Sequence, residues 1–363
     1  MSETETEAGN EVAYFLEYVR LVLERSAIEG LDLWAEQFSR LRTSGQYYQC
    51  LRLLQGIKSA QLPPYGLGIV RYGEGWLYDR LGKWIQAITA YTASIEAFKA
   101  DGMQKLEMDI WSNIGSLYQD QGQWHEAKNA YRNALALAEE AGNRRSRGAT
   151  LNNLGNLHLV NDEYDQAAQC FDEAAQILLE ASDTRNYAAA LTGRGSVECG
   201  RRHYQEAMYY YSRALKVFVE LNSREGIASV MGSIAALYQR ASQWEIARAQ
   251  YTEALSLFLQ LEDQVNVAKT LGNLALISLQ TGQPDQAMMQ ADQALSYYRD
   301  LGDAHGTATI LITLARIHAA LGHLGDTETY NDEASLLIQT HGFSDQLARL
   351  QLIQTVAANK EHD

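Results

Sequence analysis

The sequence predicts an all-α fold in which pairs of antiparallel helices stack into a superhelical solenoid. Three observations indicate this fold class. The 363 residues include only three prolines, so long helices are permitted. Small and aromatic residues recur at a spacing of forty residues, and a short polar turn divides each forty-residue unit. Neither helix of such a unit can bury its apolar face alone, so the units must stack.

Charge and composition narrow the class of partner. The chain carries 30 basic and 45 acidic residues, a net charge of −15, whereas nucleic acid or an anionic membrane attracts a basic surface. No apolar run reaches the length of about 18 residues that a transmembrane helix needs, so we expect no membrane insertion. The three cysteines lack metal-ligand or redox spacing, and the acidic N-terminus does not resemble a signal peptide. We therefore expect a cytoplasmic protein.

The N-terminal part is less regular than the rest of the chain. Residues 1–10 are polar and acidic and are predicted to form a disordered tail. Residues 11–62 are predicted to be an N-terminal helical region, with an amphipathic helix over 11–29 and then a degenerate repeat whose GQYYQC echoes the later GQWHEA. Pro63-Pro64 marks the start of the regular array, because the residue before a proline disfavours helix.

Residues 63–341 are predicted to form seven forty-residue units. In each unit small residues on both helices let the two backbones approach closely, and large apolar residues fill the remaining space. Linkers such as EEAGNRRSRG and DLGDAHG join the units, and residues 342–363 are predicted to be a capping helix and a tail. The small residues of the first helices are Gly75, Gly115, Gly155, Gly195, Ala235, Ala275 and Ala315, and the matching large positions of the second helices are Tyr91, Tyr131, Phe171, Tyr211, Tyr251, Ala291 and Asn331.

One unit shows the pattern in full, because Trp111, Ile114, Gly115 and Tyr118 on its first helix are followed by Ala127, Tyr131 and Ala134 on its second. This pattern resembles the tetratricopeptide repeat (TPR), although the common repeat of that family has about 34 residues rather than forty. The longer period is similar to that of Pins/LGN-type adaptors, kinesin light chains and bacterial Rap-type regulators. The resemblance implies a right-handed superhelix whose first helices line the concave side, and it implies protein–protein interaction.

The segment LNNLGN at 151–156 suggests where a ligand would bind. At 100° per residue, Leu151, Leu154 and Gly155 share one stripe of the helix, so the three asparagines of the segment are predicted to point away from the core. The resemblance places that face in the concave groove, where an amide can both donate to and accept from a ligand backbone. The alternative is a solvated surface inherited from duplication of one unit. The predicted peptide-binding groove residues are Asn113, Ser116, Asn152, Asn153, Asn156, Ser196 and Asn273.

The basic residues that the family uses to clamp a peptide C-terminus are absent from the candidate column, which argues against a free C-terminus as the ligand. That column reads Asp109, Ala149, Ala189, Ser229, Lys269 and Thr309.

Charged residues also occur at positions that the pattern reserves for packing. Arg194, Glu198 and Arg202 are predicted to form an i, i+4, i+8 ladder of ion pairs, with contact to a partner as the alternative. His158 occupies a packed position and is predicted to be a satisfied core residue. The basic segment 144–147 lies in a predicted linker and is interpreted as a solvated loop, with docking of an acidic partner as the alternative.

No motif predicts catalysis, a cofactor or a metal. The sequence has no HExxH, Walker A or GxSxG segment, and its eight histidines lack ligand spacing. The leading hypothesis is a non-catalytic protein- or peptide-binding scaffold or adaptor that uses the concave groove. The alternative is a ligand-gated signalling regulator. It would be Rap-like, with residues 11–62 acting on a target, or the sensing subunit of a bacterial caspase-like protease system. The partner and the oligomeric state are not predicted.

Overall fold

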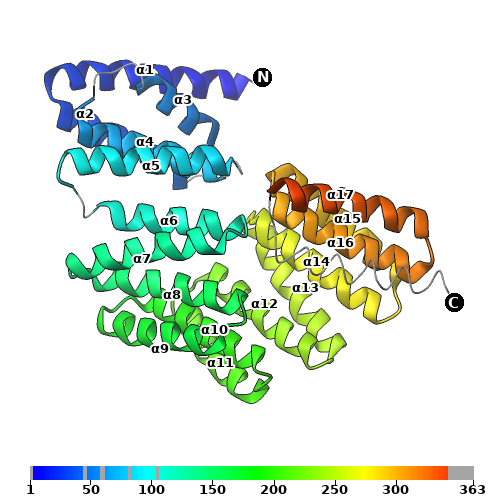
Figure 1. Ribbon diagram of the computed structural model, residues 1–363. Helices are drawn as coiled ribbons and strands as arrows, with labels where there is room; N and C mark the ends of the chain where they lie inside the picture. The colour runs from blue at the N-terminus through cyan, green and yellow to red at the C-terminus, as the bar shows by residue number, and fades with distance from the viewer. Residues whose placement is uncertain (1–2, 44–46, 58–61, 81–82, 104–105, 342–363) are drawn as a thin grey trace. The chain divides into compact units, whose positions relative to one another are not determined.

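The computed structural model describes residues 3–43, 47–57, 62–80, 83–103 and 106–341, and these form seventeen α-helices and no strand (Figure 1). The all-α solenoid of paired helices is therefore confirmed. The chain divides into two compact units, Met1–Leu117 and Tyr118–Asp363. The helices are α1 Glu3–Arg25, α2 Ala27–Thr43, α3 Tyr47–Ile57, α4 Pro64–Arg80, α5 Trp84–Ala100, α6 Glu107–Asp120, α7 Trp124–Glu140, α8 Arg144–Val160, α9 Tyr164–Glu180, α10 Thr184–Gly200, α11 Tyr204–Glu220, α12 Arg224–Arg240, α13 Trp244–Gln260, α14 Gln264–Gln280, α15 Pro284–Leu301, α16 Ala304–Leu321 and α17 Leu324–His341.

The first unit has a core of its own built by α1 to α4. Trp34 of α2 stacks on Phe38 with ring centroids 5.0 Å apart, and its indole nitrogen donates to the Leu53 carbonyl of α3. The predicted helix over 11–29 is interrupted at Ser26, which separates α1 from α2. Helix α1 also begins earlier than predicted, at Glu3, inside the segment predicted to be a disordered tail. Helix α4 begins at Pro64, where proline suits a first helical position because it has no N–H to satisfy.

In the second unit the helices follow one another every twenty residues, so two helices make up one forty-residue repeat. Helices α7 to α14 each have 17 residues, and three-residue turns join them. One residue of each turn has a positive φ, and these residues follow one another at intervals of twenty, as at Asp162, Ser182 and Arg202. The prediction that the inter-repeat linkers are loops is therefore wrong. Each linker comprises the end of one helix, a tight turn and the start of the next helix. The residues beyond the common TPR period of about 34 lengthen the helices instead.

The predicted small-residue column provides the close packing within each helix pair. A Cβ added at Gly155 of α8 would lie 2.9 Å from the Phe171 ring of α9, and one added at Gly195 of α10 would lie 2.7 Å from the Tyr211 ring of α11. Real Cβ atoms do not approach aromatic carbons so closely, so glycine permits this helix separation. The recurring glycine and aromatic columns are thus two sides of one contact.

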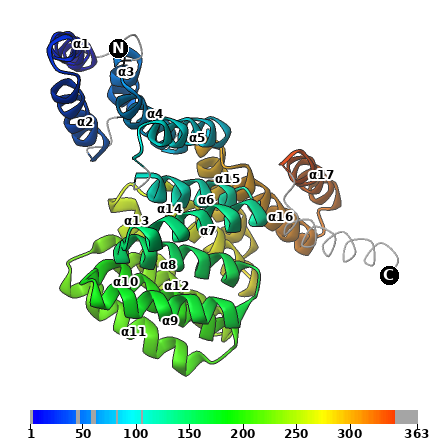
Figure 2. The same ribbon diagram turned by 60° about the vertical axis from the view of Figure 1, so that its left-hand side comes forward.

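First helices also approach one another within the second unit. Helix α10 contacts both α8 and α12, and α14 contacts α16 (Figure 2). In the described part of the chain the second helices make no comparably close contacts among themselves. Elements on the inner side of a curved stack are the closer ones, so the first helices form the inner face of this unit.

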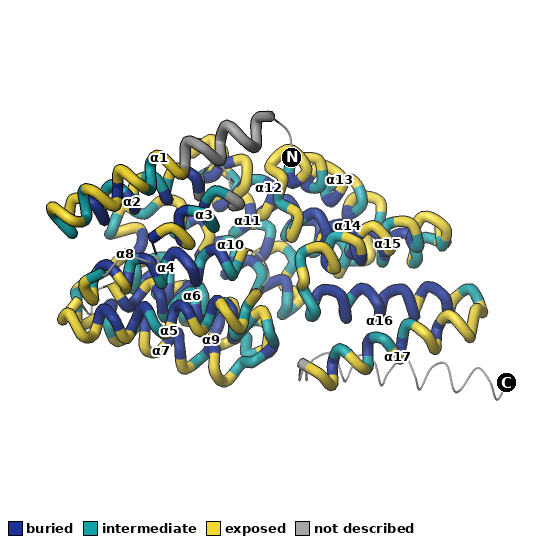
Figure 3. The backbone as a smooth tube through the Cα atoms, turned by 90° about the horizontal axis from the view of Figure 1, so that it is seen from above, coloured by how far each residue is buried: buried dark blue, intermediate teal, exposed yellow. Residues whose placement is uncertain are grey.

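Burial is greatest at one of the last helices. Helix α16 contacts both α15 and α17, and it is buried along nearly all of its length (Figure 3). None of the described helices is both long and apolar enough to span a membrane. The predicted capping helix over 343–358 lies outside the described residues.

Candidate functional site

Side-chain caps fix where each first helix of the second unit begins. The side chain of Asn143 accepts from the backbone of Ser146 at 3.1 Å, and Asp183 accepts from Asn186 in the same way. Such caps satisfy a backbone N–H that the helix itself leaves without a partner. They set the phase of α8 and α10, and hence which side chains of these helices reach the inner face.

Asn153 and Asn156 lie on α8, one of the first helices of the second unit. Asn153 is half-buried and Asn156 is exposed, and within the described residues neither amide has a hydrogen-bond partner in the protein. Asn273, at the equivalent of Asn153 on α14, is likewise half-buried without such a partner. These amides therefore have donors and acceptors available to a ligand.

Asn152 is placed differently from the prediction. Its side chain is only 6% exposed, and its amide nitrogen donates to the Asn186 carbonyl of α10 at 3.0 Å. The prediction that this residue points away from packed surface is therefore wrong. A helical wheel for one helix omits the neighbouring repeat, and the flank that carries Asn152 is the one that α10 covers. Asn152 joins two first helices.

Ser196 of α10 links the inner face to the second helix of its own repeat. Its hydroxyl lies 3.1 Å from the Thr192 carbonyl and 3.1 Å from the Tyr211 hydroxyl of α11. Burial raises the pKa of Tyr211, so its phenol stays protonated and can donate near neutral pH. Ser196 and Tyr211 therefore form a pair of hydroxyls, and both residues line a pocket.

Asn113 and Ser116 lie in the first unit, on α6. Asn113 is half-buried and its side chain hydrogen-bonds with Tyr91 of α5. Ser116 is also half-buried and makes an interaction within the described protein. The role predicted for these two residues in ligand binding stays a prediction.

A pocket of about 200 Å³ is lined by residues of α8 to α12. Arg240, at the end of α12, lines it and is exposed, and within the described residues its guanidinium has no carboxylate partner. Burial raises the pKa of Cys199 and the charge of Arg240 opposes that rise only in part, so the thiol is protonated and is not a nucleophile near pH 7. The other lining residues are Leu159, Asp162, Tyr164, Ser196, Gly200, Tyr211, Ser233 and Ala236.

Arg240 was missed by the sequence reasoning, although a signal for it exists. The forty-residue column through this position reads Arg80, Asp120, Val160, Gly200, Arg240, Gln280 and Ala320, so within the second unit Arg240 is its one basic residue. Single-helix reasoning could not show that the position faces a pocket, because residues from five successive helices, α8 to α12, line the pocket.

The charged residues around Glu198 form a cluster that differs from the predicted ladder. Glu198 is 5% exposed and pairs with Arg194, as predicted, but its other partners are Arg201 and His203. Arg202 does not continue the ladder, because it lies in the turn with φ +64°. Burial alone would raise the pKa of Glu198, but hydrogen bonds from Arg194 and His203 and nearby positive charge outweigh burial and hold that pKa below its ordinary value.

Two further predictions concern single positions. His158 is 7% exposed, and its Nδ1 contacts the Glu163 carboxylate across the turn, so its prediction as a satisfied core residue is confirmed. The basic segment 144–147 lies in the first turn of α8 and not in a loop. There Arg147 lies 3.4 Å from the Glu139 carboxylate and also pairs with Glu173, so two carboxylates of the protein balance its positive charge.

Comparison with known proteins gives three kinds of finding. The tetratricopeptide repeat model matches residues 106–180, 146–220 and 226–300, which together cover just over half of the chain. No curated protein sequence matches it.

Similar solved structures share the fold at low sequence identity. A Rap protein complexed with competence and sporulation factor is 16% identical, with a TM-score of 0.66 over 93% of this chain and 99% of that one. The Rap conjugation gene regulator of plasmid pLS20, in complex with the Phr* peptide, is 13% identical, with a TM-score of 0.65 over 93% and 96%. The apo quorum sensor NprR from B. thuringiensis is 14% identical, with a TM-score of 0.60 over 93% and 100%.

Proposed function

The chain belongs to the tetratricopeptide repeat family, and we propose that it is a non-catalytic scaffold or adaptor that binds a peptide on the inner face of its second unit. The observation that carries this proposal is the pair of unpartnered amides of Asn153 and Asn156 on α8, the helix that also contributes Leu159 to the Arg240 pocket. An extended or helical peptide brings backbone donors and acceptors, and amides can pair with both. Ser196, on the pocket wall, extends this polar surface from α8 to α10.

Two of the structural relatives support this reading. The Rap protein was solved with competence and sporulation factor bound, and the pLS20 regulator was solved with the Phr* peptide bound. Those ligands belong to those proteins, and the low identity transfers only the fold. The likeness adds that a solenoid of this kind can accommodate a peptide.

Arg240 suggests the chemistry of one part of the ligand. A guanidinium without a carboxylate partner, beside the hydroxyls of Ser196 and Tyr211, suits an acidic group. The chain as a whole is strongly acidic, so an exposed arginine without a carboxylate partner is a local site of positive charge. We propose that the bound peptide places one carboxylate against Arg240.

The test of the groove replaces both asparagines with alanine and measures affinity for peptides selected from an array of short synthetic sequences. Loss of two hydrogen bonds, each worth about 0.5–1.5 kcal/mol, should weaken binding by about tenfold. The matched control is the double change Asn129→Ala and Asn133→Ala, which removes two exposed amides from a second helix, α7. Equal affinity of both double variants and the wild type, with circular dichroism unchanged, contradicts the groove.

The test of the pocket is Arg240→Gln, measured with selected peptides and with the same peptides whose acidic side chains are changed to amides. Charge-assisted hydrogen bonds are stronger than neutral ones, so the variant should lose affinity for the acidic peptides and discriminate less between the two sets. If the variant prefers the acidic peptides as strongly as the wild type does, Arg240 does not recognise the negative charge of the peptide.

A ligand-gated regulator is the second candidate, because the first unit has a separate core that could act on a target. The two functions differ in solution scattering. A scaffold keeps its radius of gyration when a selected peptide binds, whereas a gated regulator changes it, because a ligand shifts a conformational equilibrium only by binding one state more tightly. We expect an unchanged radius of gyration.

A further inference from the structure

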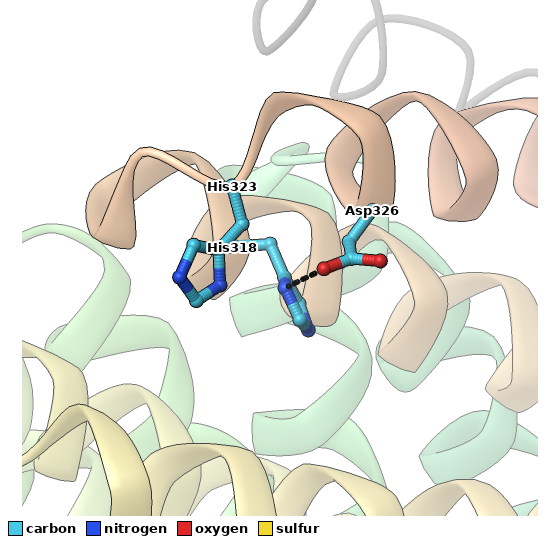
Figure 4. Close-up of side chains that lie close together, drawn as sticks. All are labelled: His318, His323 and Asp326. Carbon is cyan, nitrogen blue, oxygen red and sulfur yellow. Dashed lines mark ion pairs between the residues drawn. The ribbon is translucent and has the colours of Figure 1, made fainter.

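Two histidines and an aspartate meet at the turn between α16 and α17 (Figure 4). His318 lies near the end of α16, His323 directly precedes α17, and Asp326 lies in the first turn of α17. One possible ligand atom from each residue lies within 4.8 Å of the other two. The backbone N–H of His323 donates to the His318 carbonyl at 3.0 Å, so the turn itself holds the two histidines in place.

His318 is the buried member of this group. It is 8% exposed, and although its Nδ1 lies 3.3 Å from Asp326 Oδ2, that nitrogen has no well-formed hydrogen bond. Buried polar atoms are rarely left in this state, so such an atom requires an explanation. The Tyr330 ring, 5.3 Å from the imidazole between centroids, covers it on another side. A buried ring nitrogen is thus directed at two exposed side chains that can both coordinate a metal.

Equivalent turns in two other repeats show what these positions normally hold. His158 contacts Glu163 across one turn, and Glu198 contacts His203 across another. In both, a base faces an acid, and the two side chains satisfy each other. The α16–α17 turn places imidazoles at both positions and supplies a carboxylate three residues later. One N–H···N hydrogen bond between two neutral imidazoles would use the lone pair of only one ring, whereas a metal cation bound by both rings accepts a lone pair from each.

We propose that His318, His323 and Asp326 bind a divalent transition-metal ion, with Zn²⁺ the best fit to two imidazoles and one carboxylate. Zinc takes nitrogen ligands at about 2.0–2.1 Å in a tetrahedron, which places ligand atoms roughly 3.4 Å apart. The His318–Asp326 separation already matches this distance, and the other two separations close by rotation of the exposed His323 and Asp326 side chains. Three protein ligands leave one position for water or for a partner's side chain.

The bound ion would join the end of α16 to the start of α17. Helices α16 and α17 pack against each other, and a bound ion would add a second link between them at the turn. Zinc would hold the last described helix against the array. Its effect is therefore expected in the local stability of α17, at a distance from the Arg240 pocket along the chain.

The experiment titrates ZnCl₂ into the full chain, prepared without a histidine tag, by isothermal calorimetry. One ion should bind per chain, and His323→Asn and Asp326→Asn should each weaken that binding at least tenfold. Both residues are exposed, so these changes should leave the circular dichroism spectrum unchanged. The matched control is His125→Asn, which removes an exposed histidine of α7 and should bind zinc as the wild type does.

Hydrogen exchange provides the second readout. Zinc should slow amide exchange at the α16–α17 turn in the wild type and in the His125 variant, and should not slow it in the His323 or Asp326 variants. Absence of saturable binding at one ion per chain overturns the site. Binding that both variants retain undiminished also overturns it, because the ion would then be held elsewhere.

Discussion

At the scale of single residues, the Glu198 cluster contains the most deeply buried ion pairs of the candidate region. The side chains of Glu198 and Arg194 are 7% and 15% exposed, so removing one leaves the other poorly solvated. We expect Glu198→Ala to lower the free energy of unfolding by about 3–5 kcal/mol in urea denaturation. Asp172→Ala removes a second partner of Arg194 that is 60% exposed, and it should cost less than about 1 kcal/mol. Equal costs for the two variants would contradict the assignment of the buried pair.

The same carboxylate should make stability depend on pH. The pKa of Glu198 is lower in the folded protein than in the unfolded chain, where it is about 4.3. Its stabilising contribution is therefore complete above that unfolded value and is lost as the pH falls through the lowered folded pKa. The difference in unfolding free energy between the wild type and Glu198→Gln should be constant from pH 7 to 5 and shrink below pH 4. A difference that persists undiminished at pH 3 would show that charge is not its origin.

At the scale of helices, first and second helices of the second unit begin differently. Helices α8, α10, α12, α14 and α16 each have a side-chain N-cap, whereas none is found at the start of α7, α9, α11, α13 or α15. Asp263→Ala removes the cap of α14 and should cost about 1 kcal/mol of unfolding free energy. Gln243→Ala, at the uncapped start of α13, should be near neutral. Comparable losses would mean that Asp263 acts other than as a cap.

Substitution by glycine should have opposite effects on stability in a turn between helices and inside a helix. Glu262 has φ +54°, in the left-handed region that disfavours residues with a Cβ, and six other turns have glycine with a positive φ. Glu262→Gly should therefore raise the free energy of unfolding by up to about 1 kcal/mol. Glu253→Gly, at an exposed position inside α13, should lower it by about 1 kcal/mol. Thermal denaturation of both variants measures the difference, and destabilisation by both changes would exclude relief of strain at Glu262.

At the scale of the whole molecule, the sequence predicted what depends on periodicity. Columns such as Gly155 and Gly195 repeat because every unit packs in the same way, so the fold follows from their register. What depends on a neighbouring unit was not predictable in this way. Asn152 donates a hydrogen bond to α10, and Arg240 lines a pocket that residues of five helices form. Neither contact leaves a pattern within a single helix.

The inter-repeat turns show a different limit of the sequence. Polar and glycine-containing segments such as EEAGNRRSRG are typical of loops, yet most of that segment is helical. The cap of Asn143 and the left-handed Gly142 confine the turn to three residues. Composition therefore gave the right place for the turn and the wrong length.

The strict register makes removal of one whole repeat a test of the architecture. Deletion of residues 264–303 removes α14 and α15 with their turns and joins Asp263 to the start of α16. Asp263, which now caps α14, would then cap α16, and α13 would meet a first helix of the same phase. Because stability in a solenoid is a sum over repeats and their interfaces, we expect a helical protein that unfolds cooperatively at lower urea concentration. Asn153, Asn156 and the Arg240 pocket lie outside the deletion, so peptide affinity should be retained.

The control for this deletion removes residues 264–297, the common TPR period of about 34 residues. It leaves the end of α15 attached to Asp263 and places α16 out of phase with α13, since each residue turns the helix by about 100°. The apolar face of α16, which is buried along nearly its full length, would then meet water. We expect aggregation or loss of cooperative unfolding in this variant. Equal stability of the two shortened chains would show that the forty-residue register does not determine the stacking, since one deletion preserves that register and the other breaks it.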